Sequence, residues 1–277
     1  MIWPLLAALA LGPAKDAGGA YDPIERMSGF PSVVMNHVER VLGSASLPTG
    51  NGGTIEPGMF VTVGLERMHV FDREATKLDK GRVTDRTVAP ECRSKCAAVL
   101  FDAFQYEWLR LAVESAALAT RVPQLVHLAA HSRLPAKTLI EVAYAASETR
   151  PVVPPSLALL VNAPGRGLRA LPVHLVPPEG LELQQGSAAL GLTIEFGQGT
   201  YKVRASDPGF ARDARVQRVG QLKSVLSDLK KRYPNKEVVI LVPDDTVSVG
   251  QLLELATIVL GANFSRIVLS GGQDVFV

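Results

Sequence analysis

The feature that most constrains the fold of this 277-residue chain is an order of secondary-structure elements that occurs twice. Each copy contains a turn between two segments of alternating polarity, a helical segment, a short apolar strand, a second helical segment and a closing strand. Alternating polarity is typical of a half-buried strand, and apolar residues every three or four positions are typical of an amphipathic helix. The chain is therefore expected to fold as two similar units.

The second copy has the clearer pattern. Its polarity alternates over residues 192–205 on both sides of Gly197-Gln198-Gly199, which predicts a hairpin. The next segments are a helix at 214–233, an interior strand at 237–242, a helix at 247–261 and, at 266–277, a strand, a Gly-Gly turn and a last strand. The first of these helices is expected to bury a stripe made of Val216, Val219, Leu222, Leu226 and Leu229.

The first copy follows the same order with one interruption. Its segments are a hairpin at 60–72, a helix at 103–118, an interior strand at 124–130, a helix at 136–148 and a strand–turn–strand unit at 156–175. Residues 73–102 interrupt this order as a polar insert that holds both cysteines.

These patterns predict an α+β protein with two tandem domains. Each domain is expected to be a mixed β-sheet with two helices on one face, in the order hairpin–helix–strand–helix–strand, with a right-handed parallel crossover. The expected boundaries are a candidate signal peptide at 1–20, an N-terminal helix and linker at 21–58, a first domain at 59–175, a linker at 176–190 and a second domain at 191–277.

The first twenty residues favour export to the periplasm. The apolar run Ile2–Leu11 has the length of a secretory signal core, and small residues follow it. The run is preceded by no Lys or Arg, so a short buried helix or a misassigned start that removed a basic leader remain alternatives, and with them a cytoplasmic location. No stretch reaches the roughly 18–20 apolar residues that a membrane-spanning helix needs. A net charge of +2 gives no general attraction to nucleic acid.

The two cysteines, Cys92 and Cys96, leave several interpretations open. In an oxidising compartment they could form a local disulfide, and elsewhere they could be free thiols. A structural zinc site needs four ligands and would have to recruit distant histidines such as His69 or His127. The spacing differs from the C-x-x-C of thiol oxidoreductases, although a redox function stays open.

One stretch, "VVILVPDDTVSVGQLLELA" at 238–256, resembles the periplasmic domain of the ExbD/TolR family. In that family an apolar strand ends in Ala-Asp and is followed by a short connector and a helix. Here Asp244 occupies the position of the family aspartate, and Pro243 stands where alanine is usual. The resemblance covers residues 192–277 well and 60–175 weakly. In the first copy, "LAAHSRLPAKTL" has His131 in place of the aspartate.

The resemblance implies a role in proton-driven transport across the bacterial envelope. Family members are accessory subunits of these transducers, and their periplasmic domains dimerise and contact TonB-like partners or the cell wall. Proton relay requires an ionisable group within the membrane, and Ile2–Leu11 contains none. The resemblance therefore implies a tandem of the interaction domain that cannot conduct protons, in which two tethered copies imitate the family's homodimer.

The adjacent carboxylates Asp244 and Asp245 have a simpler structural interpretation than catalysis. Neighbours on a strand point to opposite faces, so these residues are poorly placed to share an acid–base site. Asp245, Thr246 or Ser248 can instead cap the helix that follows, and Ser248–Gln251 fits a capping box. His127 and His131 would lie about 13 Å apart along a strand, which disfavours a shared metal.

The sequence as a whole predicts a non-enzymatic periplasmic adaptor without metal or cofactor. Its expected partners are envelope proteins of a TonB/Tol-like complex or the cell wall. The expected contact is an edge strand formed by Asp274, Val275, Phe276 and Val277, which could pair with a partner strand. The alternative function is a thiol-based redox protein or enzyme that uses Cys92 and Cys96.

Overall fold

The structure, a computed structural model, describes residues 30–43, 46–150, 154–182, 191–205, 214–272 and 275–276. The elements of the N-terminal part are α2 (Phe30–Val41), β1 (Met59–Val63), β2 (Arg67–Val70), β3 (Arg73–Asp79), β4 (Arg82–Val83), α3 (Ala98–Ala117), β5 (Leu125–Ala130), α4 (Ala136–Glu148), β6 (Ser156–Ala163) and β7 (Gly167–Leu175). Those of the C-terminal part are β8 (Leu181–Glu182), β9 (Thr193–Gly197), β10 (Thr200–Arg204), β11 (Ala214–Val216), α5 (Val219–Arg232), β12 (Val238–Pro243), α6 (Val249–Gly261), β13 (Arg266–Leu269) and β14 (Val275–Phe276).

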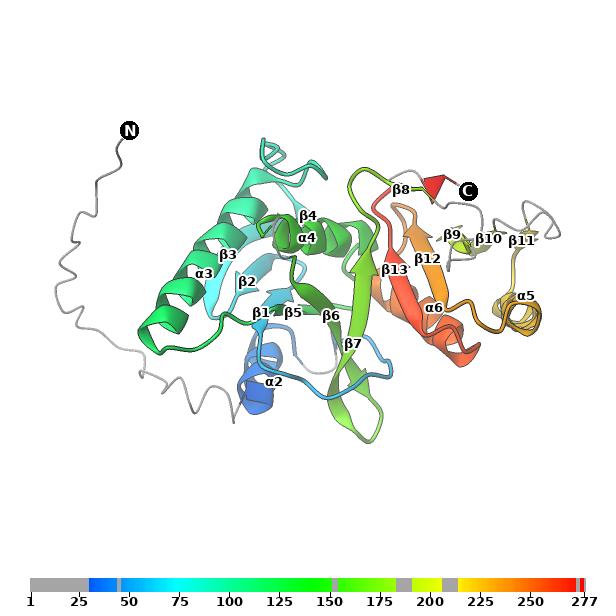
Figure 1. Ribbon diagram of the computed structural model, residues 1–277, viewed down its shortest axis with the longest axis horizontal. Coiled ribbons are helices and arrows are strands. Elements are labelled where there is room, and N and C mark those ends of the chain that lie inside the picture. The colour runs from blue at the N-terminus through cyan, green and yellow to red at the C-terminus, as the bar shows by residue number, and fades with distance from the viewer. Residues whose placement is uncertain are drawn as a thin grey trace.

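Twelve of these strands form one mixed sheet, in the order β11-β10-β9-β12-β13-β7-β6-β5-β1-β2-β3-β4. Four strands of each half share the same topology. In each, an antiparallel hairpin (β1–β2 or β9–β10) contributes its first strand to a parallel pairing with the interior strand, which pairs in parallel with the next strand. The two hairpins lie toward opposite ends of the molecule (Figure 1).

The combination of helices with a mixed β-sheet is as predicted, but the expectation of two separate sheets is wrong. Strand β7 pairs antiparallel with β6 on one side and parallel with β13 on the other, so it joins the halves into a continuous sheet. The physical reason is that an unpaired strand edge exposes backbone donors and acceptors, and each half covers the edge of the other. Val176, at the start of the predicted linker, is buried in this junction, and its N–H donates to the Leu269 carbonyl at 2.9 Å.

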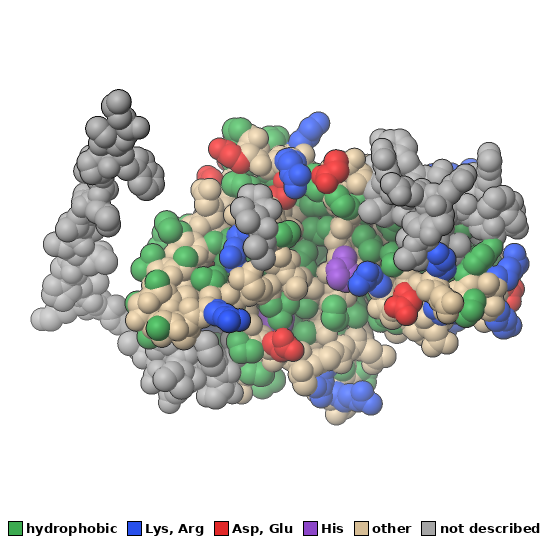
Figure 2. All heavy atoms as spheres, viewed as in Figure 1, with side chains coloured by type: hydrophobic (Ala, Val, Ile, Leu, Met, Phe, Trp, Pro, Cys, Tyr) green, Lys and Arg blue, Asp and Glu red, His purple; other side chains and the backbone are tan. Residues whose placement is uncertain are grey.

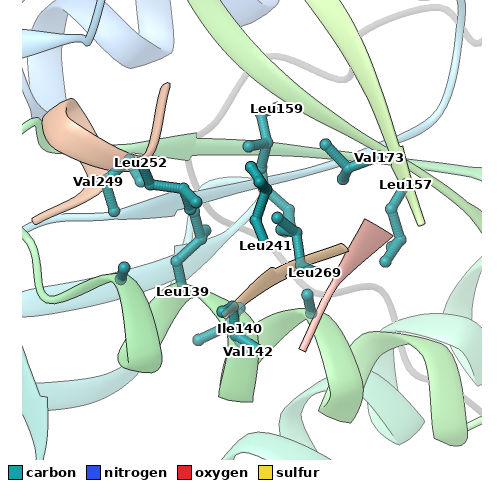
Figure 3. Packing of buried hydrophobic residues seen from close by; sticks show 14 of the residues in the cluster. Leu139, Ile140, Val142, Leu157, Leu159, Val173, Leu241, Val249, Leu252 and Leu269 are labelled. Carbon is teal, nitrogen blue, oxygen red and sulfur yellow. The ribbon is translucent and has the colours of Figure 1, made fainter. Parts of the chain in front are cut away.

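The principal apolar core lies between the sheet and helices α3 to α6. Alternate residues of each strand point into it, for example Val126 and Leu128 of β5 and Val239 and Leu241 of β12. The same cluster includes side chains from both halves, and Figure 3 shows labelled residues of β12 and β13 packed among those of α4 and β6. Helix α2 covers the opposite face of the first half, where Val34 and Val38 join a smaller cluster.

Three local predictions are corrected by tertiary pairing. Residues 214–216 form β11 rather than the first turn of α5, because they pair with β10 and bury Val216 at the sheet. The insert at 73–102 is part of the fold rather than a polar loop on its surface. Strands β3 and β4 extend the sheet, and the insert buries core residues that include Leu78 and Val83. Helix α3 begins within the insert, at Ala98.

Candidate functional site

Asp244 begins a tight turn at the end of β12. Its N–H donates to the Phe196 carbonyl at 2.9 Å, and its Oδ1 accepts from the N–H of Thr246 at 2.7 Å and from the Thr246 hydroxyl at 2.6 Å. This Asx-turn lets the chain leave the strand before α6 begins. The carboxylate lies directly over Gly197, where a Cβ atom would stand only 1.6 Å from Asp244 Oδ2. Asp244 therefore has a structural role that requires glycine at position 197.

His131 performs the same local task at the end of β5. Its N–H donates to the Val63 carbonyl at 2.9 Å, and its Nδ1 accepts from the N–H of Arg133 at 3.0 Å. The acceptor must be an unprotonated ring nitrogen, and burial, assisted by the charge of Arg133, lowers the pKa of His131. The first half thus replaces a carboxylate acceptor with a neutral imidazole in an equivalent turn.

The two segments that begin at these residues, 131–136 and 244–249, run antiparallel beside each other; we call them the connector pair. Ala136 N–H donates to the Val247 carbonyl, and Val249 N–H donates to the Leu134 carbonyl, both at 2.8 Å. Pro135 and Ser248 lie opposite each other at the centre of the connector pair. Equivalent groups exchange equivalent bonds, which is the arrangement found at the two-fold axis of a symmetric dimer.

Asp245 faces a different environment from Asp244. Its exposed carboxylate accepts from Lys137 Nζ at 2.6 Å across the junction, and this contact, together with the charges of Lys137 and Arg82, lowers the pKa of Asp245. The adjacent carboxylates therefore do not form an acid–base pair. The predicted capping box is present at Ser248: its hydroxyl accepts from the N–H of Gln251, whose side chain accepts in turn from the N–H of Ser248.

Beside the connector pair lies a cleft of about 320 Å³ that is lined by both halves; we call it the junction cleft. Its charged lining residues are Arg82, Arg86, Lys95, Lys137, Glu141 and Asp245. The amino-acid sequence does not predict this site, because its residues come from β4, the cysteine loop, α4 and the turn after β12, and no motif links them. On the face seen in Figure 2, by contrast, charged side chains are dispersed, in keeping with a net charge of +2.

Cys92 and Cys96 form a disulfide that closes the loop at one wall of the junction cleft. Both residues are buried, with exposed fractions of 4% and 1%. Glu148 holds the same loop, since its carboxylate accepts from the N–H groups of Arg93 at 2.6 Å and Ser94 at 3.0 Å. The loop is thus pinned to α4 through backbone contacts.

Two further sets of residues have geometry that bears on chemistry. Thr62, His37 and Asp72 form a hydrogen-bonded chain, with 3.2 Å between Thr62 Oγ1 and His37 Nε2 and 3.0 Å between His37 Nδ1 and Asp72 Oδ1. Thr62 is completely buried, so no substrate can reach its hydroxyl, and the chain instead holds α2 on the sheet. His127 Nε2 forms a hydrogen bond with the Glu56 carbonyl at 2.7 Å. The His127 side chain lies on the opposite face of the sheet from the principal core, which contains the disulfide.

The predicted contact strand lies apart from the main sheet. Val275 and Phe276 form β14, which pairs in parallel with β8 in a two-stranded sheet. Asp274 and Val277 lie outside the described residues.

Within the described ranges, no group of three or more His, Cys, Asp or Glu side chains is arranged to hold a metal ion. Among the same residues, no helix has the length and apolar character needed to cross a bilayer. Comparison with protein families finds no family that matches the chain, and no curated protein matches it.

Proposed function

We propose that this protein is a non-enzymatic adaptor of the bacterial cell envelope, built from two ExbD/TolR-like halves. It would associate with a proton-motive-force-driven transport complex without conducting protons itself. The observation that carries this proposal is the connector pair, in which the two halves exchange reciprocal backbone bonds between Ala136 and Val247 and between Val249 and Leu134.

The shared strand order supports the comparison with a family homodimer. Each half presents a hairpin, two parallel steps and a pair of helices on the core face, and helix α4 of one half contacts α6 of the other. A covalent tether keeps the halves at high effective concentration, so a dimer-like surface persists at any protein concentration. A permanent pair of halves is suited to a protein that binds a partner.

The disulfide supports a location in the periplasm, because disulfides persist in oxidising compartments. Fusion of residues 1–25 to a reporter that is active only after export tests this location. Reporter activity is expected, and its absence alongside activity of a fusion to a known signal peptide would contradict it.

The partner is best sought by crosslinking in intact cells followed by affinity purification of the full chain. Recovery of envelope proteins of a TonB/Tol-like complex, or of cell-wall fragments, is expected; recovery of neither would contradict the adaptor role.

A chain ending at residue 273 tests the contact strand, because β14 would be lost. If this shortened protein folds and still captures the same partners, the contact lies elsewhere.

The thiol-redox alternative is not favoured by the surroundings of the disulfide. Reactive cysteines occupy exposed, electropositive positions, whereas Cys92 and Cys96 are both buried. Slow reduction of the native protein, followed by mass spectrometry, is the expected behaviour of a structural bond. Rapid exchange with a small dithiol would instead favour redox chemistry.

A further inference from the structure

The junction cleft carries more positive charge than its acidic side chains balance. Four of its lining residues are basic, Arg82, Arg86, Lys95 and Lys137, and two are acidic, Glu141 and Asp245. We propose that this cleft binds a small dianion, either a phosphate ester or a dicarboxylate, and so gives the protein a ligand site that both halves build. This inference goes beyond the adaptor role and does not depend on it.

Two of the four cations are already paired, and two are not. Lys137 Nζ lies 2.6 Å from Asp245, and Arg86 Nη1 lies 3.2 Å from Glu141. The side chains of Arg82 and Lys95 form no ion pair or hydrogen bond with any residue that the structure describes, although the charge of Arg82 also acts on Asp245. Two charges of like sign that share a cleft repel each other, and an anion between them relieves that repulsion.

The unpaired cations stand on rigid supports. Arg82 follows the β3–β4 turn, where Gly81 packs so closely against Leu134 and Pro135 that a Cβ atom would stand 2.8 Å from each, and Gly81 N–H donates to the Leu65 carbonyl. Lys95 lies within the disulfide loop. The backbone segments that carry the two cations are therefore already ordered, so a ligand that binds between them has little backbone ordering to induce.

The size and chemistry of the cleft favour a small organic anion over a macromolecule. Its volume of about 320 Å³ lies at the lower end of the range for small-molecule sites. A guanidinium and an ammonium group are the side chains that best bind phosphate or carboxylate oxygens. Ser94 and Thr138 also line the cleft and carry hydroxyl groups, and the Ser94 hydroxyl donates to Glu148.

The test compares two double variants with the same change in net charge. Arg82→Gln/Lys95→Gln removes the unpaired cations of the cleft, and Lys223→Gln/Arg232→Gln removes exposed cations of α5. Binding of phenyl phosphate and of glutarate is measured by calorimetry and amide chemical shifts at low salt. The cleft variant is expected to bind at least about tenfold more weakly, whereas the control should match the wild type. Equal losses in both variants, or no binding of either probe to the wild type, would overturn the proposal.

A gain-of-affinity variant guards against a trivial loss of folding. Asp245→Asn removes the anion that holds Lys137, so it is expected to tighten dianion binding severalfold; unchanged or weaker binding would contradict the site. The two probes distinguish the ligand class, because tighter binding of phenyl phosphate indicates a phosphate ester and tighter binding of glutarate indicates a dicarboxylate. Partner capture from cells is a separate measurement, so failure of the adaptor role would leave this result intact.

Discussion

At the scale of single residues, the two turns that end β5 and β12 show how two different side chains can form the same kind of turn. Asp244 and His131 each offer an acceptor to the N–H two residues ahead. The sequence alone placed Asp244 at this position, but it did not reveal that His131 does the same task, because an imidazole is not a usual turn acceptor. The role became visible only through the N–H of Arg133.

The Asp244 turn predicts a specific mutational cycle with Gly197. Asp244→Ala should lower the free energy of unfolding by about 1–2 kcal/mol, since two hydrogen bonds to Oδ1 are lost, while Asp244→Asn retains an acceptor and should cost less. Gly197→Ala should destabilise more strongly through its clash with Asp244. In the double variant Asp244→Ala/Gly197→Ala the clash is relieved, so urea denaturation should show a cost below the sum of the single costs. Strict additivity would contradict the contact.

His131 predicts a pH dependence of stability. Because its pKa is lowered in the folded state, the unfolded chain binds the additional proton first as the pH falls. Stability should therefore be fully present above the unfolded pKa of about 6.5 and decline as the pH drops below it. The other four histidines have lowered pKa values too, so the test is the difference between wild type and His131→Asn. That variant keeps an acceptor without titrating, and its unfolding free energy should fall less between pH 7 and pH 5 than that of the wild type.

At the scale of elements, local pattern located most helices and strands, and tertiary pairing explains the exceptions. Helix α4 begins and ends where its periodicity predicts, at Ala136 and Glu148. The β9–β10 hairpin turns at Gln198 and Gly199, both with positive φ, as the Gly-Gln-Gly sequence predicts. Strand β11 could not be predicted, because pairing with β10 makes its three residues a strand. No pattern in their own sequence indicates one.

The disulfide loop allows a prediction about the insert. A bond between residues four apart closes a very short loop, so replacing both Cys92 and Cys96 with alanine should cost about 2 kcal/mol of stability in the chain-entropy description. Thermal unfolding of this variant should resemble that of the reduced wild type. As a control, Ala substitution of the exposed Lys77 on neighbouring β3 should change stability little. A loss as small as that of the control would mean that the hydrogen bonds of the loop, including those to Glu148, hold it without the disulfide.

At the scale of the whole molecule, the repeated element order was evident in the sequence, but the way in which the halves join was not. Prediction of two domains assumed that each half completes its own sheet. The β7–β13 pairing, the connector pair and the common core involve residues about 100 positions apart, as between Pro135 and Ser248, and no local pattern encodes such contacts. The junction cleft was missed for the same reason, since it exists only where the halves meet.

This joined architecture predicts that the halves stay together after the chain is cut. A protease site inserted within 183–190 separates β1–β7 from β9–β13 covalently, while the β7–β13 pairing, the reciprocal bonds of Leu134 and Val247, and the shared core remain. Dissociation would expose residues such as Leu241 and Leu252, which are at most 1% exposed, and would therefore be unfavourable. The cleaved protein should elute as one species in size-exclusion chromatography and unfold in a single transition, like its uncleaved parent. Two folded, separately eluting halves would show instead that each unit is an independent domain and that the junction is incidental to its stability.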